Sequence, residues 1–232
     1  LAAHEWKVPK YMAEAKKILA GIEASLIRPD YSLRRGDWDR DQHATRLSDI
    51  MPTHFDAFAQ VSNRKLWRCV KDVHYSILRQ MSLYEGVFPD FVVKGKTGWK
   101  PAPPNFLESD YDGMMYYNAC RVPWRLAAAV IENSDKDARH LLRIFNFGIG
   151  KVPNDDFMAG YHLDGKPLNE WTDGAFKAPH MCSLFVNKRK DAIATKDSQF
   201  SQHETYYQDS IRLLSLCLVT GNTFTLKSSN HR

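Results

Sequence analysis

The stretch Tyr116-Tyr117-Asn118-Ala119-Cys120-Arg121-Val122-Pro123-Trp124-Arg125 opens an apolar run over residues 126–131. Two tyrosines, a tryptophan, two arginines and an asparagine are unusually large and polar for the start of a helix. An acidic segment, Glu108-Ser109-Asp110-Tyr111-Asp112, precedes it. Aromatic faces, guanidinium groups and carboxylates together suit the gripping and cleavage of a sugar chain. The alternative is an amphipathic helix with a few surface charges.

Pro123 leaves two possibilities for where this helix starts. If the helix begins at Asn118, the proline removes a backbone N–H from its second turn and bends it. If regular helix begins at Pro123, residues 118–122 form an irregular lead-in. In both cases the backbone around Arg121 departs from a plain helix and can aim side chains into a cleft. Arg121 and Arg125 share a helical face, so we expect each to have a carboxylate partner or a ligand.

Apolar residues recur with helical period along most of the chain, and almost no strands are indicated. The expected helices cover residues 10–24, 65–84, 118–131, 138–147, 178–186 and 206–219, with one more capped by Ser48 or Asp49 and carrying Pro52 in its first turn. The first helix would place an apolar face, Tyr11, Ala15, Ile18, Leu19 and Ile22, toward other helices. The N-terminal residues 1–6 resemble the middle of a helix, which suggests a truncated or processed chain.

Three long loops, residues 28–47, 85–117 and 148–176, separate these helices and hold most of the glycines and prolines. Long polar and aromatic loops on a helical scaffold commonly carry the function of a protein. We therefore expect the functional residues to lie in these loops and at the helix ends beside them.

Composition limits the classes of protein and partner. The chain has 232 residues, of which 44% are hydrophobic and 25% charged, as expected for a soluble globular protein. No apolar run approaches the roughly 20 residues that span a bilayer, so a membrane partner is not expected. The formal net charge of +5 includes no dense basic block, which gives little support to a nucleic-acid partner.

Several kinds of catalytic or metal site are excluded by their spacing. The four cysteines lie far apart without a CxxC pair and are expected to be free thiols. The nine histidines form no HExxH motif, so no metal site and no cofactor are expected. There is no GxSxG motif, and the segment 148–151 lacks the spacing of a phosphate-binding loop. Carboxylate chemistry among aromatic residues remains.

The chain resembles glycoside hydrolase family 8, inverting enzymes that cleave β-1,4-linked glycans internally. The segment 117–125 resembles the family motif around its catalytic helix. Further segments follow in the family's order: Gly36-Asp37-Trp38, residues 45–58 (TRLSDIMPTHFDAF), Gly86-Val87-Phe88-Pro89-Asp90-Phe91 and Ala175-Phe176-Lys177-Ala178-Pro179. These ordered segments fall within about residues 10–220.

The resemblance implies an all-α fold, a partial (α/α)6 toroid of helical hairpins whose N-terminal helices are missing. Residues 1–232 would form the C-terminal part, roughly two thirds, of a single catalytic domain. In the family the general acid is a glutamate in an SEGQ-type segment, and a DxDxDIA-type segment adds an aspartate. Neither motif occurs in this chain. The general acid is therefore expected from outside it, in a missing N-terminal half that would be its partner.

The resemblance also implies an unusual general base. Many members have an aspartate where this chain has Asn118, and an amide cannot accept a proton at a useful pKa. A subgroup similar to bacterial chitosanases and β-glucanases has asparagine here and uses a glutamate in a loop inserted upstream. Glu108 fits that position and is the expected general base, with Asp110 and Asp112 as reserves. A solvated loop carboxylate is the alternative for Glu108.

The other expected site residues follow from the same resemblance. Asn118 would position the water or a sugar hydroxyl, and Arg121 would hydrogen-bond near the cleaved bond or orient a carboxylate. The expected substrate-binding residues are Tyr117, Trp124, Asp49, Asp90, Asp110 and Asp112. For three of them a structural role is an open alternative: core packing for Trp124, helix capping for Asp49 and turn formation for Asp90.

Three hypotheses for function remain open. The first is an inverting endo-hydrolase of a β-1,4-linked polysaccharide, incomplete and inactive as this fragment alone. The second is a non-catalytic glycan-binding remnant of the same fold, and the third is a helical interaction scaffold. The acidic segment suits cationic chitosan, whereas the aromatic residues suit cellulose or mixed-linkage β-glucan. An extracellular location is implied by the family alone. A partial toroid would expose apolar helix faces, so we expect the isolated fragment to aggregate or fold loosely.

Overall fold

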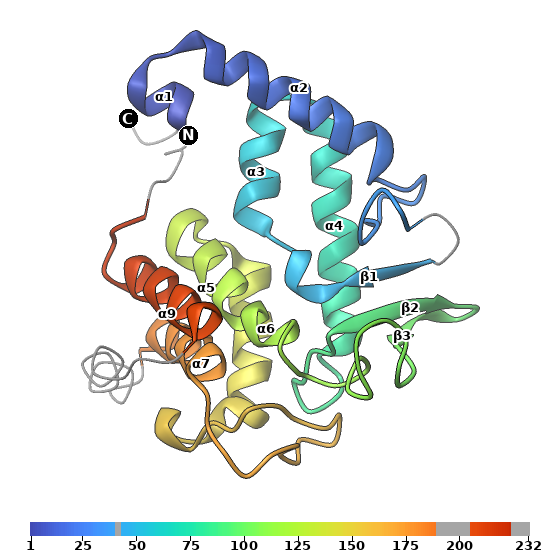
Figure 1. Ribbon diagram of the computed structural model, residues 1–232, viewed down its shortest axis with the longest axis vertical. Coiled ribbons are helices and arrows are strands. Elements are labelled where there is room, and N and C mark those ends of the chain that lie inside the picture. Colours follow the sequence, from blue (N-terminus) through green and yellow to red (C-terminus); the bar gives the residue numbers. More distant parts are fainter. Residues whose placement is uncertain (40–42, 189–204, 224–232) are drawn as a thin grey trace.

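Helices make up most of the structure, a computed structural model that describes residues 1–39, 43–188 and 205–223 (Figure 1). All the expected helices are confirmed within a few residues of their predicted ends. The α-helices are α1 (Ala2–Trp6), α2 (Pro9–Ser25), α3 (Pro52–Val61), α4 (Arg64–Met81), α5 (Val122–Asn133), α6 (Lys136–Phe147), α7 (Gly174–Val186) and α9 (Tyr206–Val219). Short 3₁₀ helices are η1 (Leu47–Asp49), η2 (Ala119–Arg121), η3 (Ile149–Lys151) and η4 (Asn154–Asp156).

A small antiparallel sheet corrects the expectation of almost no strands. Its order is β1-β2-β3, with β1 at Ala44–Arg46, β2 at Phe91–Gly95 and β3 at Gly98–Pro101. Arg46 pairs with Phe91 in the register of β1 and β2. The sheet lies inside the first two predicted loops, beside the lower end of α4 (Figure 1). It therefore links the segment before α3 to the loop that carries the acidic residues.

Two of the predicted helix starts are settled by the backbone. Residues 119–121 form the 3₁₀ helix η2, and α5 begins at Val122 with Pro123 in its first turn. A proline is tolerated there because a first-turn N–H has no partner within the helix. The expected cap of α3 by Ser48 or Asp49 is wrong, because Met51 takes the cap position and these two residues belong to η1. Asp49 is thereby available to the neighbouring site.

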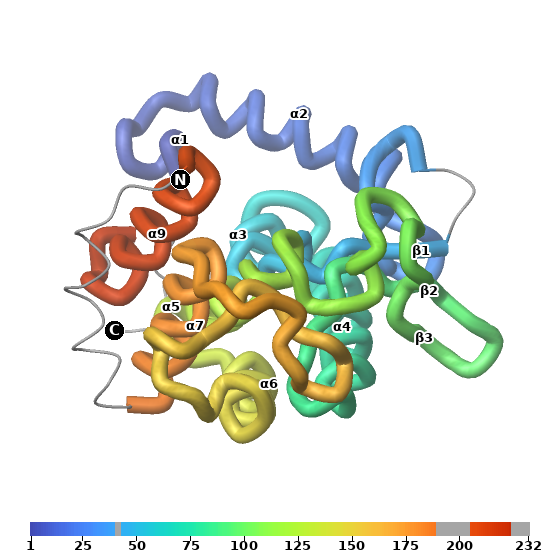
Figure 2. Tube along the Cα trace, turned by 60° about the horizontal axis from the view of Figure 1, so that its bottom comes forward, coloured from blue at the N-terminus to red at the C-terminus, as the bar shows by residue number. Residues whose placement is uncertain are grey.

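The core is continuous across most of the helices. Helix α7 packs against α5 and α9, α5 packs against α3 and α6, and α3 packs against α4. The tube in Figure 2 shows α3, α5, α7 and α9 close together, with α2 passing along one side of them. The largest fully buried side chains come from all parts of this assembly: Trp67, Phe88, Phe91, Phe145, Phe157 and Phe176. One shared core packs α3 to α9 together, and α2 joins it through Leu19.

Helix α2 buries little of its predicted apolar face. Only Leu19 is buried and Ile22 is partly buried, whereas Tyr11 is 43% and Ile18 63% exposed. Helix α1 has no buried residue. A helix of this kind is held mainly at its C-terminal end, where Glu23 accepts a hydrogen bond from Trp67 Nε1 (2.7 Å).

A buried histidine joins α4 to the segment after α2. His74 Nδ1 donates to the carbonyl of Val70 (2.6 Å), and Nε2 accepts from the backbone N–H of Leu33 (3.2 Å). These two bonds define a neutral ring with its proton on Nδ1. Burial lowers the pKa of His74 to about 4, because the charged form would lose its hydration.

Candidate functional site

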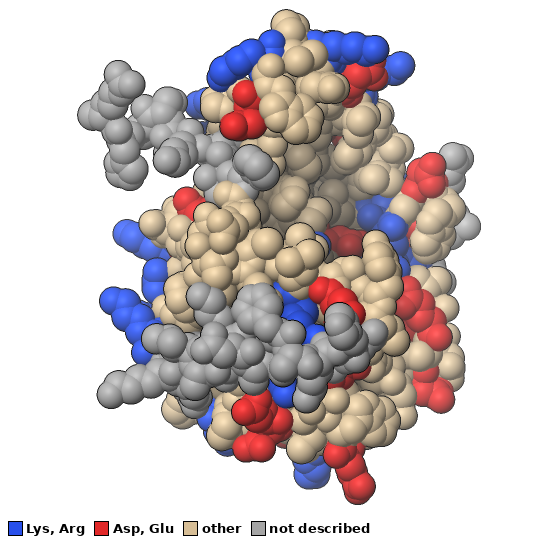
Figure 3. All heavy atoms as spheres, turned by 60° about the vertical axis from the view of Figure 1, so that its left-hand side comes forward, with Lys and Arg blue, Asp and Glu red and all other residues tan. Residues whose placement is uncertain are grey.

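Residues from several segments line an open pocket of about 350 Å³ between the sheet and the start of α5. They are Arg46, Glu108, Tyr117, Asn118, Arg121 and Tyr207. Four of these six, namely Glu108, Tyr117, Asn118 and Arg121, are among the residues expected from the sequence. Figure 3 shows a hollowed face of the molecule on which acidic and basic side chains lie next to one another.

Both carboxylate oxygens of Glu108 are held in this pocket. Arg46 donates from NH2 to Oε1 (2.9 Å), and Asn118 donates from Nδ2 to Oε2 (2.8 Å). Arg46 reaches this position across the ring of Phe91, its neighbour in the sheet, at 5.1 Å from the ring centre. Glu108 is thus a carboxylate oriented by two donors, although its side chain is 46% accessible. Each oxygen keeps lone pairs for a water or a substrate hydroxyl.

The amide of Asn118 has a defined orientation. Its Oδ1 accepts from Arg121 NH2 (3.1 Å), and a guanidinium can only donate. Its Nδ2 therefore faces the carboxylates, donating to Glu108 and, at 3.2 Å, to Asp90. Arg121 also donates to Ser48 Oγ (2.7 Å) and to the Asn118 carbonyl (3.2 Å). These contacts turn the donor side of the amide toward Glu108.

Asp90 is a buried anchor for this part of the backbone. Its carboxylate accepts from the N–H groups of Tyr116 (2.8 Å), Asn118 (3.0 Å) and Ala119 (2.7 Å), besides the Asn118 amide. Burial raises the pKa of Asp90 to about 6, while these donors favour its ionised form. Asp90 is only 2% exposed, so the expectation of substrate contact is corrected to a positioning role.

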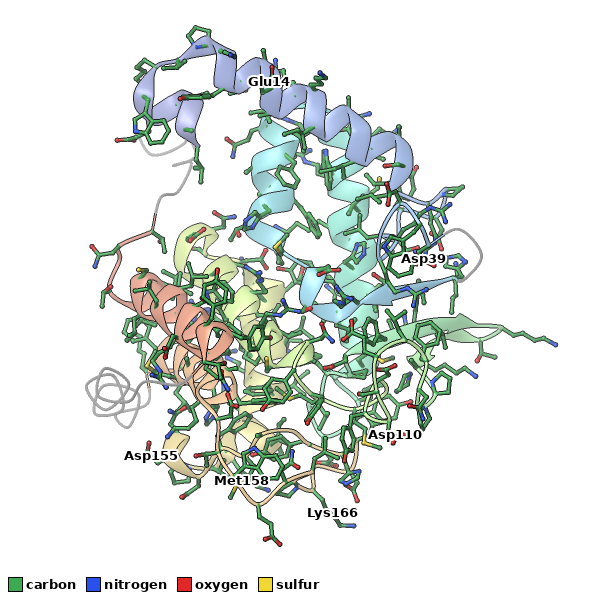
Figure 4. The ribbon with its side chains drawn as sticks, viewed as in Figure 1. Glu14, Asp39, Asp110, Asp155, Met158 and Lys166 are labelled. Carbon is green, nitrogen blue, oxygen red and sulfur yellow. The ribbon has the colours of Figure 1, made fainter. Side chains whose placement is uncertain are left out.

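The acidic segment spreads its carboxylates in different directions. Asp112 is buried and accepts from the backbone N–H groups of Leu107 (2.6 Å), Glu108 (2.9 Å) and Ser109 (3.0 Å). Asp110 accepts from Asn105 Nδ2 and lies on the loop after β3 (Figure 4). Neither lines the pocket. Asp112 is buried, which corrects its expected substrate contact to contacts within the loop, whereas Asp110 is exposed and its expected substrate contact stays a prediction. Of the three, Glu108 alone faces Asn118.

Asp49 and Arg125 lie near the residues of the pocket but do not line it. Asp49 Oδ2 is 4.0 Å from Arg46 NH1, and burial raises its pKa against the opposing effect of Arg46, Arg121 and Arg125. Arg125 stacks on the ring of Trp124 at 4.0 Å from its centre, which favours the packing role of Trp124 over sugar stacking. Burial lowers the pKa of Arg125 to about 10. The expected carboxylate partners of Arg121 and Arg125 are not found within ion-pair distance in the described ranges.

The aromatic ring of Tyr117 forms part of the lining of the pocket. Its hydroxyl donates to Asp173 Oδ2 (2.8 Å), which also accepts from Gln208 Nε2 (3.0 Å). Tyr207 donates from its hydroxyl to the carbonyl of Tyr117, and the two ring centres are 6.2 Å apart. The start of α9 is thereby fixed beside the entrance of α5. Both rings line the pocket, as residues that pack on sugar faces would.

Sequence reasoning missed four residues that build the site. Arg46 and Ser48 lie in the family-like segment 45–58 but were not expected to contact the pocket, and Asp173 and Tyr207 lie far along the chain. Only the fold brings them together. For Arg46 the available signal was its place in the family-like segment 45–58.

Elsewhere in the described residues the candidates for a functional site are weaker. A hollow of about 690 Å³ lies against β2 and β3, but its lining residues, such as His43, Lys94 and Phe106, include no carboxylate. Within the described residues, no group of three or more His, Cys, Asp or Glu side chains is arranged to hold a metal ion. No helix in the same ranges is long and apolar enough to cross a bilayer.

Comparison with known proteins identifies the relatives, although no family model matches the chain. A β-glucanase from Niallia circulans is 34% identical over 230 residues, which cover 93% of this chain and 56% of that protein. An endoglucanase from Bacillus sp. strain KSM-330 is 30% identical over 224 residues, covering 91% and 48%. The chain thus spans about half the length of the curated relatives it matches.

Solved structures agree with these relatives. A β-1,3-1,4-glucanase from Paenibacillus sp. X4 superposes with a TM-score of 0.85 at 32% identity, covering 93% of this chain and 61% of that one. A GH8 xylanase from Teredinibacter turnerae superposes with a TM-score of 0.80 at 16% identity, covering 98% and 64%, which shows the fold alone. The resemblance to glycoside hydrolase family 8 is confirmed. The described helices form part of an (α/α)6 toroid, the fold of these structures.

Proposed function

We propose that this chain provides the general-base side of an inverting family 8 endo-hydrolase, with Glu108 as the base. The observation that carries the proposal is the pair of hydrogen bonds to the carboxylate of Glu108, donated by Arg46 (2.9 Å) and Asn118 (2.8 Å). A base must be oriented within hydrogen-bond reach of its water. Asn118 cannot be the base itself, because an amide has no basic oxygen at useful pH.

The proposed reaction is a single displacement. Glu108 takes a proton from water, the water oxygen attacks the anomeric carbon, and the bond to the leaving sugar oxygen breaks as an acid protonates that oxygen. The two carboxyl groups of an inverting pair stand about 6.5–9.5 Å apart, which leaves room for the water. In this proposal the acid comes from an SEGQ-type segment outside residues 1–232, as the family resemblance implies. Arg121 orients Asn118 in this scheme, and Tyr117 packs on a sugar face.

The charges around the base favour a neutral β-glucan over chitosan. Of the charged side chains that line the pocket, Arg46 and Arg121 are cationic and Glu108 is anionic. A cationic glucosamine chain would be repelled by this arrangement. The named relatives, a β-glucanase and two endoglucanases, point the same way. Action on an external polysaccharide also implies an extracellular protein.

The test measures hydrolysis of lichenan, carboxymethylcellulose and chitosan by the full-length protein, with proton NMR of the first products. We expect lichenan to be cleaved at least tenfold faster than chitosan, with α-anomers appearing before mutarotation. Early β-anomers would contradict inversion, and faster cleavage of chitosan would contradict the glucan assignment. Binding of lichenan without any hydrolysis would support the non-catalytic remnant instead.

A further inference from the structure

The loop that carries Glu108 is organised around one buried carboxylate. Asp112 is 1% exposed, and its Oδ2 accepts from the N–H groups of Leu107 (2.6 Å) and Glu108 (2.9 Å). Its Oδ1 accepts from the N–H (3.0 Å) and the hydroxyl (3.4 Å) of Ser109. Three consecutive N–H groups therefore converge on one side chain, which determines the direction in which the backbone turns at Glu108.

Asp112 is itself fixed to the rigid part of the fold. Its carbonyl accepts from the backbone N–H of Phe91 in β2 (2.9 Å). The next residue, Gly113, lies so close to Ala102 that an added Cβ would stand 2.1 Å from the carbonyl oxygen of Ala102. Asp112, which holds the backbone of residues 107–109, is thus also the point at which the loop is fixed to the end of the sheet.

Phe91 connects both halves of the base site. Its ring supports the guanidinium of Arg46, its backbone holds Asp112, and the preceding residue, Asp90, holds the backbone around Asn118. The two buried aspartates therefore act on opposite partners of one hydrogen bond. Asp90 places the amide of Asn118, and Asp112 places the carboxylate of Glu108.

We propose that Asp112 is a positioning residue that sets the location of Glu108, an inference that rests on the proposed role of Glu108 as the base. Asp112 acts through the backbone and does not contact the pocket. Replacement of Asp112 by asparagine keeps the shape of the side chain but turns an N–H₂ group toward backbone donors. The N–H groups of residues 107–109 then lose one of their two acceptor atoms. The displaced Glu108 then holds its water poorly, although the substrate still binds.

The test is a double-mutant cycle on lichenan in the full-length protein, with Asp112→Asn in the wild-type and Glu108→Gln backgrounds. We expect Asp112→Asn to lower kcat by about 10- to 100-fold with KM changed less than threefold. In the Glu108→Gln background it should lower the residual rate less than threefold, because the residue through which it acts has lost its function. Asp112→Ser, which keeps a smaller acceptor, serves if the asparagine variant unfolds.

A matched control is Asp164→Asn, because Asp164 also accepts a backbone N–H, from Lys166 (3.1 Å), in an exposed turn that does not line the pocket. It should leave kcat unchanged. Equal losses from Asp112→Asn in both backgrounds, or a lower melting temperature with unchanged kcat for the folded enzyme, would overturn the positioning role alone. Full activity of Glu108→Gln would overturn the proposed base and this inference with it.

Discussion

Asn118 Nδ2 donates a 2.8 Å hydrogen bond to Glu108 Oε2 across ten residues of sequence. The bond joins the start of the α5 region to the loop after β3, and Arg121 fixes the amide orientation that makes it possible. An uncharged donor suits this place, because it can serve Glu108 and Asp90 together without a charge of its own. Asn118 thus holds the carboxylate of Glu108, which the loop supplies, in place by a hydrogen bond.

Asn118→Asp is expected to lower kcat on lichenan at least tenfold. The substitution removes the N–H₂ donor and places a third carboxylate within hydrogen-bond distance of Glu108 and Asp90. Like charges so close raise each other's pKa and push the side chains apart. Steady-state kinetics check this expectation. An aspartate variant as active as the wild type would mean that residue 118 can act as the base.

Arg46→Gln is expected to reduce kcat about tenfold and to change the free energy of unfolding by less than about 1 kcal/mol. The pair with Glu108 is partly exposed, with side chains 23% and 46% accessible, so it contributes little stability. Its effect lies in orienting Oε1. Arg46→Lys keeps the charge but not the planar stacking on Phe91, so it should restore activity only in part. Urea unfolding beside kinetics separates the two effects.

His74 is expected to make the protein acid-sensitive. Its pKa is lowered from 6.5 to about 4 in the fold, so between these values the unfolded chain binds a proton that the folded chain does not. The contribution of the neutral His74 ring to the free energy of unfolding is therefore fully present above pH 6.5 and is lost as the pH falls toward 4. The loss between pH 7 and pH 5 is about 2 kcal/mol. Urea unfolding at both pH values should show a smaller loss in His74→Gln, and an equal loss would contradict this account.

The exposed face of α2 is expected to make the isolated chain associate. Ile18 is 63% and Tyr11 43% exposed on a helix that buries only Leu19. Ile18→Gln should shift light-scattering profiles of the isolated chain toward monomer, because it removes apolar area from the surface. Lys17→Gln, one position away, is the control and should have no such effect. A wild-type chain that is monomeric and melts cooperatively would show that α2 needs no cover.

The helical part of the fold could be predicted from the sequence because amphipathic period and the position of Pro123 act locally. The small sheet was missed, since β1 has three residues and the pairing of Arg46 with Phe91 joins segments far apart. The signals available for β2 and β3 were the short apolar run at 91–93 and the glycines at 95 and 98. Such short strands gain their stability from the neighbouring helix α4 and the third strand.

Site residues that belong to a sequence motif could be predicted. Site residues that only the fold brings together were missed. Glu108, Asn118 and Arg121 share one pocket, as expected. Asp90 and Asp112 have the residue type of a substrate contact, and the sequence does not show that backbone N–H groups occupy both carboxylates. Arg46 was missed because its partner lies 62 residues away.

The kcat of Glu108→Gln on lichenan tests the central claim most directly. Glutamine keeps the size of the side chain and removes the basic oxygen, so the rate should fall by about 10²- to 10⁴-fold with the melting temperature nearly unchanged. Glu14→Gln, an exposed substitution on α2 (Figure 4), is the matched control and should keep full activity. A Glu108→Gln protein with kcat within threefold of the wild type would contradict the account.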